Sequence, residues 1–261
     1  MRWKVFAIVA SVAAVLAASS ASAQTSLVVG ADFSSLKFDS SGGKFSQTNV
    51  AGSVSTEVDM GIVIEADGSY HRISDSSYSS KNWTGGGSVF WKGEDGRLGI
   101  NAAYNNIDDF IFPFSVSGHV TSYGAFGEWW PTSDFTLGLK AGAYNGSGTK
   151  GAYVGGKFDY YVLPNIAFHV SADYTKFSSG GPKQTDISGG FEWLAIKGVP
   201  VSLYGGYTYT KNETAFFGSQ KVGTFSIGLR LYMDDEGGTL VSRQRQGAAG
   251  WANAFVTPVR F

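Results

Sequence analysis

The sequence predicts an all-β fold, a transmembrane antiparallel up-and-down β-barrel of twelve strands that follows a cleaved signal peptide. Three observations predict it: an N-terminal export signal, a strand–turn–strand unit that occurs five times, and alternation of apolar and polar residues along the strands. The 261 residues include 36 Gly, 19 Phe, 13 Tyr and 7 Trp but no Cys. An exported chain without disulfides needs another source of stability. Backbone hydrogen bonds closed around a barrel supply it, since lipid offers the backbone no partners.

The first element is a secretory signal over residues 1–23. Arg2 and Lys4 form its positive end, residues 5–18 are apolar, and residues 21–23 (Ala-Ser-Ala) form a small-residue cleavage site. A single transmembrane anchor is the alternative, but the apolar run is too short to cross a membrane. We therefore expect the signal to be removed and the mature chain to leave the cytoplasm.

A hairpin unit is repeated along the mature chain, and its clearest copy is Tyr123 to Gly146. Residues 131–134 (Pro-Thr-Ser-Asp) form a turn, and the strand after it alternates strictly between apolar and polar residues, as a strand with two different faces does. The turns are taken at Asp59, Asp95, Asp134, Asn165 and Gly198, which lie 36, 39, 31 and 33 residues apart. This regular spacing favours a meander of neighbouring hairpins over scattered strands.

One strand before the hairpins and one after them complete the set. The first is predicted over Thr25–Asp39, followed by a loop over Ser40–Gln47, and the closing strand is predicted over Val222–Met233. An even number of strands places both termini on one side, as in bacterial barrels. We therefore expect short turns in the periplasm and longer connections outside the cell, at residues 74–81, 106–118, 176–184 and 211–221.

Aromatic residues favour a membrane over a soluble core because they gather at both ends of the predicted strands. We expect one belt beside the short turns and a second at the opposite strand ends, since the headgroup region solvates amphipathic rings. The first belt comprises Trp91, Trp129, Trp130, Tyr160, Tyr161 and Trp193, and the second Tyr70, Tyr104, Tyr174 and Tyr207. Tyr144 is out of phase with the apolar face of its strand, so either a bulge intervenes or its ring points inward.

The closing strand carries a pattern that is similar to the barrel-assembly signal of bacterial outer-membrane proteins: Ser226, Gly228, and then Leu231 and Met233. With the export signal and the hairpin repeat, the region from residue 25 to 233 resembles the outer-membrane β-barrel superfamily of Gram-negative bacteria, with its small porin-like and opacity-type barrels. The resemblance implies a location in the cell outer membrane. The partners it implies are outer-membrane lipid, lipopolysaccharide and the barrel-assembly machinery.

The chain departs from that superfamily because 28 residues follow the closing strand. We favour a barrel over residues 24–233 and a periplasmic C-terminal tail over residues 234–261. In the alternative, Trp251–Phe261 is the last strand, but Pro258 interrupts it. The arginines of the tail are then available to contact acidic periplasmic partners or to plug the inner mouth of the barrel.

Period two assigns a set of charged residues to the inside of the barrel, and these are the functional candidates. In one interpretation they are paired residues that fill a closed interior, because charges away from water need partners. In the other they line a narrow wet passage. The set comprises Glu57, Glu65, Asp67, Lys92, Glu128, Lys140, Lys157, Asp159, His169, Asp173, Glu192 and Arg230.

Four of these charges, Glu128, Asp159, Glu192 and Arg230, occupy equivalent positions at the inner mouth. Three acids against one arginine predict a slightly acidic ring. In a narrow lumen such a ring favours the passage of cations.

Other functional classes receive little support from the sequence. The formal net charge of −1 argues against nucleic acid, and three scattered His without Cys give no metal-ligand pattern, so we expect no cofactor and no metal. His169, Ser171 and Asp173 share a face, but residues of one strand point in parallel and form a poor catalytic triad, so we expect no enzyme. His71 and His119 are predicted to be solvated histidines at strand ends.

The function that the sequence favours is a narrow porin-like passive channel for small solutes. The alternative is a closed structural or surface-recognition barrel that acts, like an adhesin, through its extracellular loops. The aromatic residues of the segment from Asn106 to Gly118 favour some role for that loop, either as a constriction or on the lipopolysaccharide surface. A lipid hydrolase of the outer membrane is the least favoured function.

Overall fold

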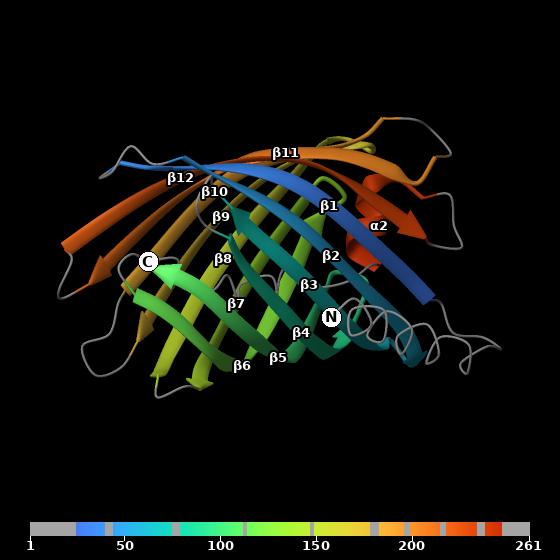
Figure 1. Ribbon diagram of the computed structural model, residues 1–261. Helices are drawn as coiled ribbons and strands as arrows, with labels where there is room; N and C mark the ends of the chain where they lie inside the picture. Colours follow the sequence, from blue (N-terminus) through green and yellow to red (C-terminus); the bar gives the residue numbers. More distant parts are fainter. Residues whose placement is uncertain are drawn as a thin grey trace, which may run out of the picture.

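The computed structural model describes residues 25–39, 44–74, 79–111, 114–146, 149–177, 183–195, 199–214, 218–233 and 238–246. They form twelve strands and one short helix (Figure 1). The strands are β1 (Thr25–Phe38), β2 (Lys44–Asp59), β3 (Ile62–Ser74), β4 (Ser79–Lys92), β5 (Gly96–Ile111), β6 (Phe114–Thr132), β7 (Phe135–Gly146), β8 (Thr149–Leu163), β9 (Ile166–Phe177), β10 (Lys183–Leu194), β11 (Val201–Thr214) and β12 (Gly218–Met233). The helix is α2 (Leu240–Gln246).

Every strand pairs antiparallel with its neighbour in the chain, and β1 pairs with β12 to close the barrel. The closing ladder runs from Leu27 opposite Met233 to Phe38 opposite Val222, so the predicted closing strand is the last one. The prediction of a twelve-stranded antiparallel barrel is confirmed. All backbone groups of the wall can therefore be paired within the chain, as a membrane requires.

Four of the predicted short turns, at Asp59, Asp95, Asp134 and Asn165, lie where the sequence predicts them, and the fifth, at Gly198, lies outside the described residues. The connections at the other end are shorter than predicted. β5 and β6 stay paired from residue 106 to Ile111 opposite Phe114, within the predicted loop. Lys44–Gln47, expected as loop, is already strand β2. The strands extend past their predicted ends because antiparallel pairing continues to satisfy their backbone groups.

The two faces of the wall differ as period two requires. The outward positions of β7, from Leu137 to Ala143, are apolar, whereas Thr136 and Lys140 face inward and are buried. Tyr144 is buried, and the pairing of β7 with both neighbours continues past it without a shift. Its ring therefore points inward, and no bulge is involved.

The only helix in the described part of the chain belongs to the predicted tail. Among the described residues no helix is long and apolar enough to cross a membrane. α2 lies at the barrel end where β1 begins and β12 ends (Figure 1), the end that the sequence predicts to face the periplasm. Residues 1–24, with the predicted signal, and 247–261, with the alternative last strand, lie outside the described residues.

Candidate functional site in the barrel lumen

The inner face of the barrel holds the candidate site, and the twelve predicted lumen charges all lie on it. The inward positions are even-numbered in β4, β6, β7, β10, β11 and β12 and odd-numbered in β2, β3, β5, β8 and β9, as burial alternates along each strand. Contacts that skip a strand support this placement, since two side chains reach across an intervening strand only on the inside of the wall. Lys157 of β8 contacts Glu128 of β6, and Lys140 of β7 contacts Asp173 of β9.

A chain of charged groups crosses the periplasmic half of the lumen. The guanidinium of Arg97 lies 2.9 Å from Glu128 Oε1, and Lys157 Nζ lies 2.9 Å from the same oxygen. Lys157 Nζ also lies 2.9 Å from Asp159 Oδ2. The other carboxylate oxygen of Asp159 is hydrogen-bonded to His169 Nδ1 at 2.9 Å. The side chains of Arg97 and Glu128 are each 1% exposed, so this chain replaces water with internal partners.

Glu192 is the centre of a second polar cluster on the same level. Its Oε1 accepts hydrogen bonds from Ser202 Oγ (2.5 Å) and Tyr232 Oη (2.6 Å), and its Oε2 accepts one from Arg230 (2.6 Å). His169 Nε2 lies 4.0 Å away and connects this cluster with the Arg97–Asp159 chain. Together the two clusters form a network that spans β5 to β12, which we call the charge network.

The charge network does not have the acidic balance predicted for the inner mouth. Arg97, which the sequence-based set omits, adds a cation directly beside Glu128. Glu57 is matched by Lys92 at 3.0 Å. The carboxylates at this level are Glu57, Glu128, Asp159 and Glu192, and the cations on the strands are Lys92, Arg97, Lys157 and Arg230. The named residues therefore do not show the acidic excess on which the expected cation selectivity is based, and the selectivity itself stays a prediction.

Helix α2 is docked onto the charge network and is not a free tail. Gln244 donates a 2.9 Å hydrogen bond to Glu192 and accepts one of 2.8 Å from Tyr161 Oη. Arg245 donates to the carbonyl oxygens of Thr132 (2.8 Å) and Phe135 (2.7 Å). The helix thus reaches from the end of β6 to β10 and covers this part of the periplasmic mouth.

An apolar cluster supports the docked helix. Leu240 is fully buried and packs with Tyr161, Ala167, Leu194 and Tyr232, and its backbone N–H donates to Pro164 at 2.8 Å. The guanidinium of Arg243 lies 5.6 Å above the Tyr232 ring and that of Arg245 lies 5.4 Å above the Trp130 ring. Arg243 and Arg245 bring two more cations to the mouth.

Two aromatic residues of the predicted periplasmic belt belong to this site. Trp130 is 7% exposed and donates through Nε1 to Glu128 at 3.4 Å, and Tyr161 is 4% exposed. Their assignment to the belt is wrong because neighbouring residues of a strand face opposite sides, so Trp129 and Tyr160 occupy the outer positions. The remaining predicted belt residues lie on the outer face: Trp91, Trp129, Tyr160 and Trp193 at one end and Tyr70, Tyr104, Tyr174 and Tyr207 at the other.

The middle level of the lumen is polar, and part of it stays exposed to solvent. Asp32 accepts hydrogen bonds from Asn49 (2.7 Å), from Ser34 (3.0 Å) and, past the intervening strand β12, from Tyr204 (2.9 Å). The inward positions nearby carry small residues, and Ala51, which pairs with Gly30 and with a serine of β3, is exposed although it faces the lumen. Water therefore reaches this stretch of the inner wall.

Both histidines that the sequence assigns to solvated strand ends have partners. His71 Nδ1 lies 2.6 Å from Asn49 Oδ1, and Nε2 lies 2.9 Å from Ser69 Oγ, inside the lumen. His119 stacks on Tyr104 with ring centroids 5.6 Å apart. The hydrogen bonds of His71 join three strand positions that sequence spacing does not connect.

His169, Ser171 and Asp173, which share a face but are not expected to form a catalytic triad, are not brought together. His169 contacts Asp159, Ser171 Oγ lies 2.6 Å from Ser188 Oγ, and Asp173 lies 3.4 Å from Lys140 Nζ. The Ser69–His71–Asn49 series has the order of a nucleophile, base and orienting group. Because β3 is paired on both sides at Ser69, the backbone N–H groups there belong to the ladder and cannot form an oxyanion hole.

Sequence reasoning missed Arg97, Asp32, Tyr204 and Gln244. For Arg97 the signal existed, since it is in phase with the inward Asn101 on the same strand. Asp32 and Tyr204 are likewise in phase with inward positions. No sequence signal marks Gln244, because its partners Tyr161 and Glu192 come from distant strands.

No protein-family model matches the sequence, and no curated protein matches it. Solved structures of similar fold include a KdgM porin, with 12% identity over 77% of this chain and 98% of the porin and a TM-score of 0.52. The CymD monoaromatic hydrocarbon channel has 10% identity over 81% of this chain and 89% of its own, with a TM-score of 0.54. The translocator domain of the autotransporter NalP from Neisseria meningitidis has 14% identity over 82% and 90%, with a TM-score of 0.51.

At such identities the likeness concerns the fold. The exposed outer face of the present barrel is apolar along its middle, with residues such as Ile100, Leu139 and Leu229 among the most exposed. By its closed ladder and its apolar outer face, the chain has the fold of a closed antiparallel β-barrel, the fold that these structures share with it.

Proposed function

We propose that the barrel is a narrow passive channel for small polar solutes, closed at the periplasmic mouth by α2 in this conformation. The observation that carries the proposal is the small, polar and solvent-accessible inner wall of the middle level, around Gly30, Ala51 and Ser69. A barrel filled only for stability gains most from large apolar side chains at such positions. Small residues there leave room for water and solute.

The contacts of α2 suit a removable plug. The helix has seven residues, one fully buried leucine, and mostly polar contacts with the strands. Glu192 keeps Arg230, Ser202 and Tyr232 as partners when Gln244 leaves. Undocking of α2 therefore does not leave the carboxylate of Glu192 without a partner in the lumen. The cost of opening is therefore modest.

The balance of charges at the mouth supports passage of neutral or weakly anionic solutes. Carboxylates and cations of the strands are matched there, and Arg243 and Arg245 of α2 add positive charge when the helix is docked. Two neighbours of similar fold, the KdgM porin and the CymD channel, are themselves described as a porin and a channel. Their fold is thus compatible with conduction.

The test is single-channel conductance in planar bilayers. The full chain should show rare, small openings. Gln244→Ala combined with Arg245→Ala should raise the open fraction, since the hydrogen bonds of both side chains to the strands are lost. Ser242→Ala is the matched control, because Ser242 bonds only to Thr239 within the same turn. If the double variant folds and does not conduct, the closed structural or surface-recognition barrel is the better account.

The proposal includes no catalytic step. Ser69, His71 and Asn49 act in it as a hydrogen-bonded part of the lumen wall, because the ladder leaves no free N–H groups near Ser69 to hold an oxyanion. Covalent labelling of Ser69 by a fluorophosphonate probe would contradict this role and favour a hydrolase.

A further inference from the structure

The outer face of the extracellular rim carries basic residues in directly opposed pairs. Outward positions there are identified by their phase with exposed apolar residues such as Phe33, Trp83 and Ile187. Four hairpins place two cations opposite each other: Lys37 with Lys44, Arg72 with Lys81, Lys176 with Lys183, and Lys211 with Lys221. A fifth hairpin adds Lys150, opposite Asn145. We call these nine residues the basic rim.

The distribution of cations on the described strands is one-sided. Lys92, Arg97, Lys140, Lys157 and Arg230 all face the lumen, so every outward-facing Lys or Arg of the described strands belongs to the basic rim. The described acids on the same outer face are Glu213, which contacts Lys211 at 2.5 Å, and the exposed Asp39. Among the residues whose side chains the structure describes, the rim therefore keeps an excess of positive charge.

Opposed like charges weaken a sheet, because side chains of directly paired residues are close. Natural pairs of this kind are tolerated where an anion lies between them. The rim faces outward and not into the lumen, so a solute in the channel is not that anion. Anionic headgroups of a surrounding membrane can supply it.

The height of the rim identifies the kind of anion. Arg72 and Lys176 each follow a belt tyrosine, Tyr70 and Tyr174, by two residues, and Lys81 precedes Trp83 by two. Two residues of a strand correspond to about 7 Å. Because aromatic belts mark the edge of the hydrocarbon layer, the cations stand one step further out, at the level of lipid headgroup phosphates.

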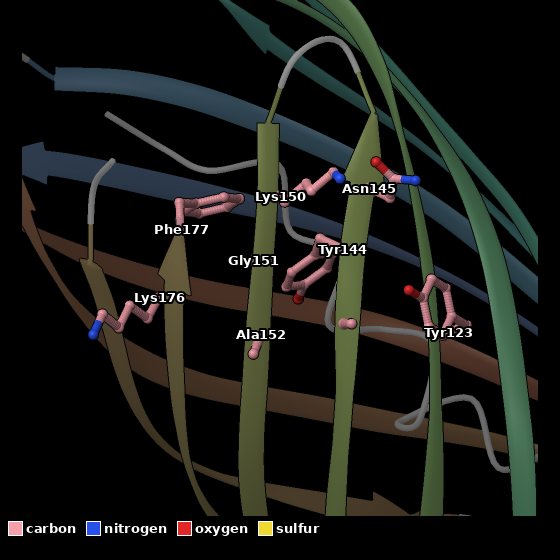
Figure 2. Close-up of a pocket in the computed structure, with 9 residues that line it drawn as sticks. Tyr123, Tyr144, Asn145, Lys150, Gly151, Ala152, Lys176 and Phe177 are labelled. Carbon is pink, nitrogen blue, oxygen red and sulfur yellow. The ribbon is translucent and has the colours of Figure 1, made fainter. Parts of the chain in front are cut away.

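One part of the rim contains a hollow next to two of its lysines. The cavity has a volume of about 460 Å³, and its lining includes Ala143 and Ala152, which are paired with Tyr123 and Lys176 respectively. Lys150 and Asn145 lie at its upper end in Figure 2, above Ala152. A lining that combines two alanines with two lysines is complementary to an acyl chain with a phosphate at its head.

We propose that the basic rim binds the phosphate groups of lipopolysaccharide, with the hollow between Tyr123 and Lys176 as the site for one lipid A molecule. Lys150 and Lys176 contact the phosphates, and the two alanines of the lining receive part of an acyl chain. The opposite end of the barrel has no outward cation on its described strands, which agrees with an asymmetric membrane whose outer leaflet alone contains this lipid. The proposal does not depend on whether the barrel conducts.

The test measures binding of purified lipid A, with both phosphates, to the detergent-solubilised full chain. Lys150→Gln combined with Lys176→Gln should reduce the affinity by about thirtyfold at low salt, since each lysine near an anionic headgroup contributes on the order of 1 kcal/mol. Lipid A without phosphates should bind the wild type as weakly as the double variant binds the complete lipid. Heat-modified gel migration verifies that each variant is folded.

Two further variants separate the hollow from the rest of the rim. Ala143→Leu combined with Ala152→Leu fills the hollow without changing charge and should also weaken binding, whereas Arg72→Gln combined with Lys81→Gln removes an equal charge elsewhere and should have the smaller effect. If the Lys150/Lys176 variant and the Arg72/Lys81 variant lose the same amount of affinity, the assignment of the hollow is overturned. Equal affinity for phosphatidylglycerol, or for lipid A without phosphates, would overturn the assignment of lipopolysaccharide.

Discussion

The cations inside the barrel and those on its outer rim obey opposite rules. Arg97, Lys157 and Arg230 each lie within 3 Å of a carboxylate of another strand. On the outer rim Arg72 lies opposite Lys81, and Lys176 opposite Lys183. Both sets occupy regular strand positions of the same wall, at opposite ends of the barrel, so the difference reflects their surroundings and not the local backbone.

The difference shows where neutralisation comes from. A buried lumen offers no counter-ions, and a cation that stays there needs a carboxylate within the chain. The rim faces headgroups, where anions are plentiful, and pairs of cations can be retained for them. Interior charges should therefore govern the stability of the barrel, and rim charges should govern its binding of lipid.

The largest effect is expected from breaking the charge network at Glu128. Glu128→Gln removes the carboxylate that Arg97 and Lys157 share. The side chain of Arg97 is 1% exposed, so water cannot replace the lost partner. Removing one partner of a buried pair costs about 3–5 kcal/mol. The free energy of unfolding of the barrel, measured by tryptophan fluorescence during urea titration, should fall by that amount.

Glu57→Gln is the control for the burial of the pair. Its salt bridge to Lys92 has a length of 3.0 Å, but the side chains are 32% and 19% exposed, so solvent can replace the lost partner. The expected loss is below about 1 kcal/mol. Equal losses for the two variants would mean that burial does not distinguish the charge network from an ordinary surface pair.

A second, smaller effect is expected at the apolar anchor of α2. Leu240→Ala removes a fully buried side chain from the cluster around Tyr161 and Leu194, which costs about 2–3 kcal/mol of docking. The helix should leave the mouth, and trypsin should cleave after Arg243 and Arg245 in the variant but not in the wild type. The urea midpoint of the barrel should stay unchanged.

Val241→Ala provides the comparison, because Val241 packs only at the margin of the same cluster. Its protection against trypsin should remain close to that of the wild type. If Leu240→Ala also lowers the unfolding midpoint of the barrel, α2 is an integral part of the wall, and the proposed removable plug is wrong.

The strand order and the two faces of the wall follow from the sequence because period two is strict wherever one side meets lipid. The same rule limits the prediction of strand ends. Residues 107–111 and 114–118 continue the ladder although the sequence predicts a loop there, because backbone pairing between strands does not require an alternating pattern. Trp129 and Trp130 are neighbours on one strand, so the alternation of side chains already requires one of the two rings to point inward. The prediction of the belt considers only that both rings lie near a turn.

The partners of the lumen charges could not be predicted in the same way. The sequence assigns Lys157 and Glu128 to the inner face, but their contact crosses an intervening strand and depends on the curvature and stagger of the closed barrel. The docking of α2 depends on Tyr161 and Glu192, whose approach is fixed only when β8 and β10 are in place. A seven-residue helix with two arginines has no local pattern that indicates burial.

The smallest effect is expected from reversing one charge of the rim, and it should change sign with the environment. Lys81→Glu replaces the like pair with Arg72 by an opposite pair across β3 and β4. In detergent without lipopolysaccharide the variant should be more stable by about 0.2–1 kcal/mol, since directly opposed opposite charges favour a sheet and like charges weaken it. Lys211→Glu also replaces a like pair, with Lys221, but it loses the contact with Glu213 and places two acids side by side, so the gain in stability should be smaller than for Lys81→Glu.

Adding lipid A should reverse the order of wild type and Lys81→Glu. The wild type gains stability by binding the lipid, since a ligand that binds only the folded state stabilises it, and the variant with its weakened rim gains less. Both effects should diminish at high salt, because exposed charges are screened. A variant that is more stable than the wild type with and without lipid A would show that the rim cations are not retained for lipid phosphates, and the contrast between the inner and outer charges would then need another cause.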